Sequence, residues 1–218
     1  MAEQHELKEA ERAAAAAGVA VSRETMERLV LYVALLRKWN PSKNLVAPAT
    51  LAQVWTRHIA DCLQLATLVP PGRIWIDLGS GAGLPGLVIA AVLAEQPGAH
   101  IHCVESKLGK AAFLREAARI MKVPATVHAE RIEDVVADWS GPVDVVTARA
   151  LASLQQLVGM SHDLLKSGAI GLFLKGQDVE RELTEAAKYW KLDTVLTPSA
   201  TDPQARIVTL RSAVPVSS

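Results

Sequence analysis

The 218-residue sequence predicts an α/β protein with a doubly wound, mostly parallel sheet and an N-terminal helical extension. Three observations lead to this prediction. From residue 73 onward, strand-like and helix-like patterns alternate, which is typical of a parallel sheet. The first strand pattern runs into a turn with glycines at 79, 81, 83 and 86. Residues before 70 show helical periodicity. Since half of the residues are apolar, we expect a helical extension over 1–70 and one compact unit over 71–218.

The N-terminal part is expected to hold helices at 3–17, 22–39 and about 50–68. The second begins at Ser22, a residue type that caps helices. It presents one apolar stripe at the spacing i, i+3, i+4, i+7 and i+10, formed by Leu29, Tyr32, Val33, Leu36 and Trp39. Because a tryptophan on such a stripe is more typical of packing than of base stacking, we expect Trp39 in the core.

The C-terminal part is expected to alternate strands with helices. We expect strands at 73–79, 99–105, 125–130, 143–150 and 169–176, and helices at 84–95, 106–122 and 151–165. The stretches 191–198 and 205–212 fit a terminal hairpin. Because doubly wound sheets bind ligands at the carboxyl ends of their strands, the turn after the first strand is the first candidate site.

Composition argues against several classes of protein. No run of 18 apolar residues occurs, and Met1 begins a charged, alanine-rich helical pattern in place of a signal peptide, so we expect a cytoplasmic protein. Cys62 and Cys103 lie far apart in apolar contexts and are expected to be buried free thiols, and we expect no metal site. Net charge is zero, yet residues 31–122 hold ten basic and five acidic residues. That surplus fits a basic face for nucleic acid or a solvated helix face.

The glycine-rich turn matches two ligand-binding motifs. Gly81, Gly83 and Gly86 spell the G-x-G-x-x-G of dinucleotide-binding proteins. Asp77, with the glycines at 79, 81 and 83, spells the D-x-G-x-G-x-G of S-adenosylmethionine-dependent methyltransferases. The acid favours the second motif, because a carboxylate repels a diphosphate and suits a cationic amino-acid ligand. We therefore expect S-adenosylmethionine as cofactor and a Rossmann-like class I methyltransferase fold.

Two further stretches extend this site. Glu105 closes the second strand, where a carboxylate can accept hydrogen bonds from both ribose hydroxyls; alternatively it is an acid favoured by the dipole of the next helix. HAERIED follows the third strand, and its backbone can pair with an adenine edge unless it is a simple surface turn.

Several longer stretches resemble a known family. KWNPSKNL, RHIADC, DLGSGAGLPGL, ESKLGKAAFLR, AERIED, ARALASL and LKGQ occur in the order found in the RsmG (GidB) family of bacterial 16S rRNA guanine-N7 methyltransferases. The resemblance covers roughly residues 26–211. It implies a cytoplasmic enzyme that uses S-adenosylmethionine to methylate N7 of guanine 527 in 16S rRNA.

The resemblance also implies roles for individual residues. By position, Gly79 and Leu84 line the cofactor, and Ile132 and Glu133 flank its adenine. Arg149 reaches the site and is the candidate catalytic residue. The full set of candidate cofactor-binding residues is Asp77, Gly79, Gly81, Leu84, Glu105, Ile132, Glu133 and Arg149.

The chain departs from the family pattern outside the cofactor loop. Members commonly carry N-L-T, whereas this chain has Val46 in place of the threonine. They carry R-H-x-x-D-S, where this chain ends the motif with Cys62, and S-R-A-F, where this chain has the run from Ala148 to Leu151. These exchanges affect packing and RNA contacts more than the cofactor, so they weaken the substrate prediction more than the cofactor prediction.

The missing catalytic devices agree with N7 as the target atom. Methylation of cytosine C5 needs a cysteine nucleophile, and exocyclic amines need an N/D-P-P-Y/F clamp after the fourth strand, where this chain reads VDVVTARALAS. Guanine N7 is a nucleophilic lone pair with no proton to remove, so positioning and electrostatics suffice. Because the A-form major groove is too deep and narrow for side chains, the guanine should lie in a loop or opened RNA.

The roles of the remaining polar candidates stay open. Arg149 orients the methionine end of the cofactor or the O6 of guanine, or it forms a salt bridge to Asp144 or Asp77. Arg57, His58 and Asp61 either line the site or play a structural part, with Arg57 and Asp61 paired on one helix face. Candidate phosphate contacts are Lys38, Lys43, Asn44, Lys107 and Lys110.

Alternative functions also remain. Lys175 ends the fifth strand, where a ribose 2′-O-methyltransferase keeps a basic lysine, so that activity or another RNA methyl transfer is an alternative. An NAD(P)-binding oxidoreductase and a non-catalytic S-adenosylmethionine-sensing or RNA-binding module are others. We expect 16S rRNA or the 30S subunit as partner, no membrane contact and a monomer.

Overall fold

The structure, a computed structural model, describes residues 2–69 and 72–216. The expected boundary at residues 70 and 71 lies outside the described residues. Before it lie α1 (Ala2–Ala16), α2 (Arg23–Lys43), α3 (Pro48–Leu51), the π-helix η1 (Trp55–Ala60), α4 (Asp61–Leu63) and the 3-10 helix η2 (Gln64–Thr67). After it lie β1 (Ile74–Leu78), α5 (Gly86–Leu93), β2 (His100–Val104), α6 (Leu108–Met121), β3 (Ala125–His128), α7 (Ile132–Ala137), β4 (Val145–Arg149), α8 (Leu154–Lys166), β5 (Ile170–Lys175), α9 (Val179–Ala186), β6 (Trp190–Pro198) and β7 (Arg206–Pro215).

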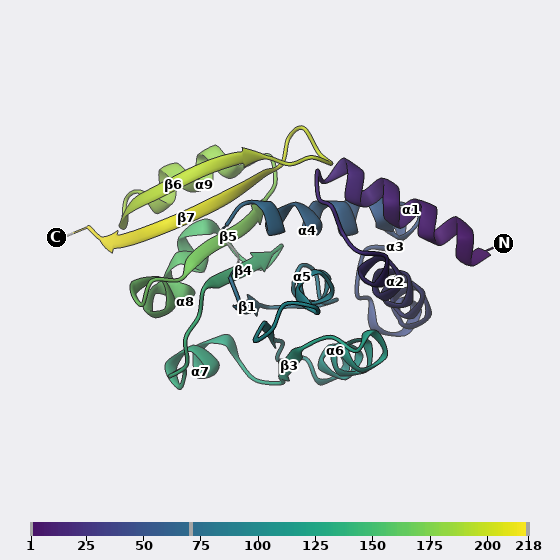
Figure 1. Cartoon of the computed structure of the whole chain (residues 1–218). Coiled ribbons are helices and arrows are strands. Elements are labelled where there is room, and N and C mark those ends of the chain that lie inside the picture. Colours follow the sequence, from purple (N-terminus) through teal and green to yellow (C-terminus); the bar gives the residue numbers. More distant parts are fainter. Residues whose placement is uncertain (1, 70–71, 217–218) are drawn as a thin grey trace.

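These strands form one sheet in the order β3-β2-β1-β4-β5-β7-β6. β1 to β5 run parallel, β7 is antiparallel to β5, and β6 pairs antiparallel with β7 as the expected hairpin. Figure 1 shows α2, α5 and α6 on one side of the sheet and α7 and α8 on the other. The predicted fold class is confirmed. Because the strand order reverses between β1 and β4, a ligand crevice is expected at their carboxyl ends.

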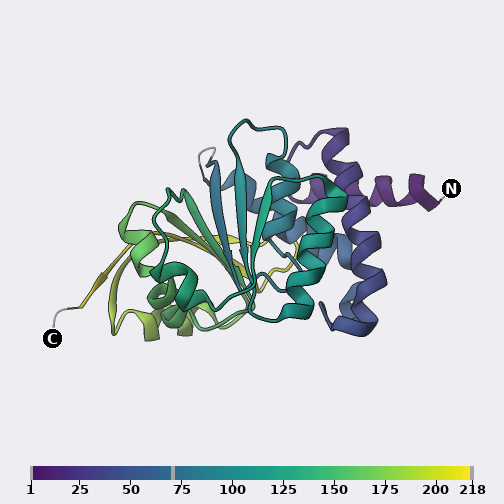
Figure 2. The same ribbon diagram turned by 90° about the horizontal axis from the view of Figure 1, so that it is seen from below.

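Side-chain alternation along the strands divides the core between the two faces of the sheet. Trp75 and Ile101 belong to a cluster that α1, α2, α5 and α6 cover. Ile76 and Val146 belong to a second cluster, covered by α7, α8 and α9. In the side-on view of Figure 2 the strands fan out beside α2 and α6, and the two termini lie at opposite ends of the molecule. Because helices cover both faces of the sheet, a ligand can reach the strands only at their ends.

The helix α2 follows the predicted stripe closely. The Ser22 hydroxyl accepts a hydrogen bond from the Thr25 N–H at 3.1 Å, which caps the start of the helix. Asn44, in the left-handed conformation, caps its end. Trp39 packs against Phe113 of α6 with ring centroids 5.8 Å apart, so it has the packing role that was expected, although it is only partly buried, at the edge of the core.

Three expectations about helices were wrong. The region 50–68 is not one helix but α3, η1, α4 and η2 in succession, since a π-turn interrupts the α-helical hydrogen bonding. The helices expected from 84 and 151 begin at Gly86 and Leu154, because the glycine turn extends to Pro85 and Ser153 caps the start of α8. The helices α7 and α9 were not expected. Both are short, and α9 buries only Val179 and Ala186, so neither shows a long periodic stripe.

Two further sequence expectations can be compared with the described residues. Cys62 and Cys103 are buried free thiols, as expected. None of the helices in the described part of the chain combines the length and the apolar character needed to cross a membrane.

Candidate cofactor and substrate site

The turn after β1 requires glycine for its backbone and its close contacts. Gly79 and Gly83 have φ of 66° and 82°, which L side chains rarely adopt. A Cβ on Gly79 would lie 2.6 Å from the Leu151 side chain, and one on Gly83 would lie 2.7 Å from the Leu87 side chain. The turn therefore presents bare backbone at the carboxyl end of β1.

Asp77 lies beneath this turn and does not line the cavities beside it. Its side chain is buried, and its Oδ2 accepts a hydrogen bond from the Gly86 N–H at 3.0 Å. A Cβ on Gly86 would lie 2.6 Å from the same oxygen, so only glycine fits at the start of α5. Oδ1 has no hydrogen-bond partner among the described residues. Burial raises the pKa of Asp77 to about 7. Its contacts show that Asp77 holds the turn in place from below.

Glu105 ties the glycine turn to the start of α6. Its Oε2 accepts from the Gly81 N–H at 3.0 Å, and its Oε1 accepts from the Lys107 N–H at 2.8 Å. The side chain is 8% exposed and faces a cavity. Each carboxylate oxygen has acceptor capacity left after one such bond. Both expected roles, ribose acceptor and helix-start acid, are therefore compatible with its position.

Three adjoining cavities lie around the carboxyl ends of the parallel strands. The β2-side cavity, of about 340 Å³, is lined by the candidates Gly79, Gly81, Glu105, Ile132 and Glu133. The α3-side cavity, of about 330 Å³, is lined by Leu84, Arg149 and His58, together with the turn. The β5-side cavity, of about 280 Å³, lies beyond Arg149 toward Lys175 and Asp202. The predicted candidates other than Asp77 thus line the first two cavities.

Ala150 lies where the three cavities meet. It lines all of them, and it is a non-glycine residue with φ of 51°. A left-handed alanine is strained, and such strain persists where surrounding contacts fix the chain. The side chain of its neighbour Arg149 extends toward the N-terminal segment.

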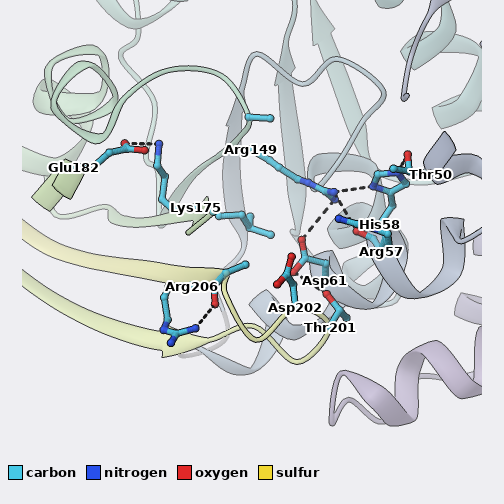
Figure 3. Close-up of a pocket in the computed structure, with 14 residues that line it drawn as sticks. Thr50, Arg57, His58, Asp61, Arg149, Lys175, Glu182, Thr201, Asp202 and Arg206 are labelled. Carbon is cyan, nitrogen blue, oxygen red and sulfur yellow. Dashed lines mark hydrogen bonds and ion pairs between the residues drawn. The ribbon is translucent and has the colours of Figure 1, made fainter. Parts of the chain in front are cut away.

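The Arg149 guanidinium is held by acceptors from residues 57–62 (Figure 3). Its Nη2 donates to the Arg57 carbonyl at 3.1 Å and to His58 Nδ1 at 2.7 Å. Its Nη1 donates to Cys62 Sγ at 3.5 Å and lies 3.8 Å from Asp61 Oδ2. The alternatives of a salt bridge to Asp144 or Asp77 were wrong, since Asp144 accepts instead from backbone N–H groups of Arg73 and Ile74.

His58 is a neutral acceptor in this network. Because a guanidinium can only donate, His58 Nδ1 must accept, and Nε2–H then donates to Thr50 Oγ1 at 2.8 Å. Burial, together with the charges of Arg149 and Arg57, lowers the pKa of His58 to about 4. His58 therefore fixes the direction of Arg149 without adding a charge.

Asp61 bonds to a distant loop and not to Arg57. Its Oδ1 accepts from Ser199 Oγ at 3.0 Å and from Thr201 Oγ1 at 3.3 Å, both in the loop between β6 and β7. The expected pair between Arg57 and Asp61 was wrong. Arg57, His58 and Asp61 all line the β5-side cavity, which supports the site-lining alternative.

Lys175 is engaged at the end of β5. Its ammonium pairs with Glu182 Oε2 at 2.6 Å and donates to the Ala152 carbonyl at 2.8 Å. Only 9% of its side chain is exposed. Lys175 lines the β5-side cavity, and its amino group is already engaged by Glu182 and the Ala152 carbonyl.

Several lining residues could not be identified from the sequence. Thr50, Thr201, Asp202 and Arg206 line the β5-side cavity from three separate segments. None of them stands in a motif, and only the folded chain brings them beside β4 and β5.

Comparison with known proteins identifies the family. The profile of the GidB family, described as rRNA small subunit methyltransferase G, matches residues 25–207. A protein of that description from a Bradyrhizobium species is 57% identical over 92% of this chain and 90% of its own length. Another, from Methylobacterium radiotolerans, is 52% identical over 93% of this chain and 95% of its own length.

Solved structures agree in fold. Cofactor-bound Rv0187 from MTB superimposes with a TM-score of 0.60 and 14% identity, over 83% of this chain and 90% of that one. The O-methyltransferase from Bacillus cereus in complex with SAH gives 0.57 and 13%, over 82% and 90%. At such identities the likeness shows the fold alone. The sequence matches confirm the predicted resemblance, and the chain belongs to the rRNA small subunit methyltransferase G (GidB) family.

Proposed function

We propose that the chain transfers a methyl group from S-adenosylmethionine to N7 of a guanine in 16S rRNA, guanine 527 by its family. The observation that supports this most directly is the meeting of three cavities at Ala150. A cofactor spanning the β2-side and α3-side cavities and a guanine in the β5-side cavity would bring donor and acceptor together at that residue.

The lining residues fit the parts of this cofactor. We propose that Gly79 and Gly81 receive it on bare backbone, and that Glu105 accepts from its ribose. Ile132 and Glu133 then flank the adenine. Leu84 and Arg149 line the methionine side, and Asp77 contributes through the turn that it holds. Two observations support this placement of the cofactor. Position 79 has no room for a side chain, so its backbone stays open to a ligand, and each carboxylate oxygen of Glu105 can accept a further hydrogen bond.

The residues at the junction suit a reaction that needs no general base. Bound S-adenosylmethionine supplies an electrophilic methyl group, and N7 supplies its own lone pair. Arg149 is a donor only, and His58 Nδ1 already accepts from it. These groups can orient a base and exclude water, which is what an N7 transfer requires.

Arg149 is proposed to orient the guanine or the cofactor carboxylate. Its hydrogen bonds and ion pair with residues 57–62 fix the guanidinium plane at the edge of two cavities. A hydrogen bond to guanine O6 would hold the base, whereas a bond to N7 would block the reaction.

The geometry disfavours the ribose 2′-O alternative. That reaction needs a group that takes the hydroxyl proton, and Lys175 at the end of β5 is the candidate. Its amino group is engaged by the Glu182 carboxylate and the Ala152 carbonyl and is not free to approach a ribose hydroxyl.

We also propose the wider setting of the reaction. Residues 1–70 form a helical extension and 71–218 the methyltransferase domain, and the chain acts as a monomer in the cytoplasm on 16S rRNA or the 30S subunit. Light scattering of the purified protein tests the monomer, and parallel assays on naked rRNA and on 30S subunits identify the substrate.

The central experiment is transfer of tritiated methyl from S-adenosylmethionine to 16S rRNA and 30S subunits, followed by borohydride–aniline cleavage, which cuts RNA at N7-methylguanine. We expect one cleavage site, with Arg149→Ala as the weakened control. Methyl incorporation without cleavage would assign a different acceptor atom, and cofactor binding without incorporation would support the non-catalytic alternative.

A further inference from the structure

Three lysines converge beside the proposed cofactor and guanine cavities. Lys43 lies in the last turn of α2, Lys107 caps the start of α6, and Lys110 lies in the first turn of α6. A Cβ on Gly109 would lie 3.6 Å from the Lys43 ammonium, so Lys43 lies against the first turn of α6. Lys110 lines both the β2-side and the α3-side cavities. We call Lys43, Lys107 and Lys110 the lysine cluster.

Folding stability does not explain the lysine cluster. Within residues 2–69 and 72–216, no salt bridge joins any of its members to a carboxylate. Lys107 and Lys110 lie at the positive end of the α6 dipole, where cations are unfavourable. Lys43 is favoured by the C-terminal end of its own helix α2, but its ammonium extends to the first turn of α6 and adds a third charge there. Like charges gathered at a destabilising position are typical of a surface that receives an anion.

An apolar side chain stands among these lysines. Leu108, the first residue of α6, is 73% exposed, the largest exposed fraction among the large apolar side chains of the described residues. It lies between Lys107 and Lys110 in sequence. Opened or single-stranded RNA offers phosphates and the flat faces of unstacked bases together, which suits cations around an apolar side chain.

We propose that the lysine cluster and Leu108 bind the rRNA strand next to the methylated guanine, with the lysines on phosphates and Leu108 against an unstacked base. This inference rests on the proposed function and adds the surface that holds the substrate. The position on the rim of the cavities places the bound strand beside the junction at Ala150.

The competing anion is the carboxylate of the cofactor. Lys110 faces the α3-side cavity, where the methionine end is proposed to lie, so it could pair with that group. Lys107 lines the β2-side cavity but not the α3-side one, and Lys43 lines neither, whereas an RNA backbone can contact all three lysines. The two ligands therefore predict different responses to the loss of the cluster.

The test replaces the lysine cluster with Lys43→Gln, Lys107→Gln and Lys110→Gln together. A matched control carries Lys166→Gln, Lys188→Gln and Lys191→Gln, which remove three exposed charges near the amino ends of β5 and β6. Filter binding to 16S rRNA at several salt concentrations, methyl transfer and cofactor binding are measured for each. Circular dichroism checks that each variant folds.

We expect the cluster variant to raise KM for rRNA by about tenfold or more while kcat changes little. The slope of log K against log salt should fall by about 0.7 for each single-strand phosphate that the variant no longer neutralises. Cofactor affinity should fall by much less than rRNA affinity does, and the control should match wild type. Leu108→Ser should weaken RNA binding without changing the salt slope, because it removes no charge.

Two outcomes would overturn the inference. One is a cluster variant whose rRNA affinity and salt slope match those of the control. The other is a large loss of cofactor affinity with unchanged rRNA binding, which would assign the lysines to the cofactor carboxylate. Failure of the proposed function would give a different result: wild-type protein would yield no N7-methylguanine. The filter-binding experiment does not depend on turnover, so it tests the lysine cluster independently of the methyl transfer.

Discussion

Replacing Asp77 by asparagine tests why a carboxyl group lies buried beneath the glycine turn. Asp77 keeps one oxygen on the Gly86 N–H, while the other has no hydrogen-bond partner in the described part of the chain. Asparagine preserves the shape and the acceptor for Gly86 and removes the ionisation. It therefore mimics the protonated form of Asp77 at every pH.

The size of the effect follows from the pKa. Burial raises the pKa of Asp77 from 3.8 to about 7, and each pKa unit corresponds to ~1.4 kcal/mol. Ionisation thus costs the folded protein about 4 kcal/mol relative to the unfolded chain. Between about pH 4 and pH 7 the folded state binds more protons than the unfolded state, so stability falls as pH rises through this window.

Urea unfolding of cofactor-free protein at several pH values measures the difference. Asp77→Asn should be more stable than wild type by only about 1 kcal/mol near pH 4.5 and by about 4 kcal/mol at pH 8. Asp163→Asn, which changes an exposed carboxylate, should follow wild type. At pH 8 the variant should bind S-adenosylmethionine more weakly, because the carboxylate no longer attracts its cationic groups. Unfolding free energies that stay parallel from pH 4.5 to pH 8 would refute this account of Asp77.

Three further predictions concern the junction at Ala150. Arg149→Ala should lower kcat by more than about tenfold, and turnover within twofold of wild type would remove Arg149 from the reaction. His58→Ala should lower kcat more than it raises KM, since it frees the guanidinium. With saturating S-adenosylmethionine, so that protonation of Asp77 does not limit cofactor binding, the wild-type kcat should be kept down to about pH 5, because the pKa of His58 is lowered to about 4. Gly79→Ala should cost about 1–2 kcal/mol in stability from its left-handed backbone alone, with a further loss of cofactor affinity from the close approach to Leu151. The double variant Gly79→Ala/Leu151→Ala should recover part of the lost cofactor affinity, which titration calorimetry measures. If the double variant binds the cofactor as weakly as Gly79→Ala alone, backbone strain and not crowding by Leu151 is responsible.

The strands and the cofactor turn could be predicted from the sequence because their signals are local. β1 and the glycine turn are contiguous, and the alternation of strands and helices from residue 73 fixes a parallel sheet. The hydrogen bond between Arg149 and His58 joins residues 91 positions apart, and no local pattern encodes it. The same holds for the place of Asp77: an acid at the end of a strand can point into the crevice or beneath the turn, and the absence of room for a Cβ at Gly86 becomes visible only in the fold.

The N-terminal helical segments do more than cover the sheet, because they orient the residue at the centre of the site. β4 presents Arg149, yet the acceptors of its guanidinium belong to η1 and α4, where the π-turn places the Arg57 carbonyl, His58 and Cys62 on one side. Asp61 then connects this segment to the loop between β6 and β7 through Ser199 and Thr201. A base entering the β5-side cavity would touch β4, η1 and that loop together. The Asp61 carboxylate thus contacts the loop through one oxygen and lies 3.8 Å from Arg149 Nη1 with the other, so it joins the loop to the guanidinium, and the substrate cavity is built by the N-terminal segment as much as by the sheet.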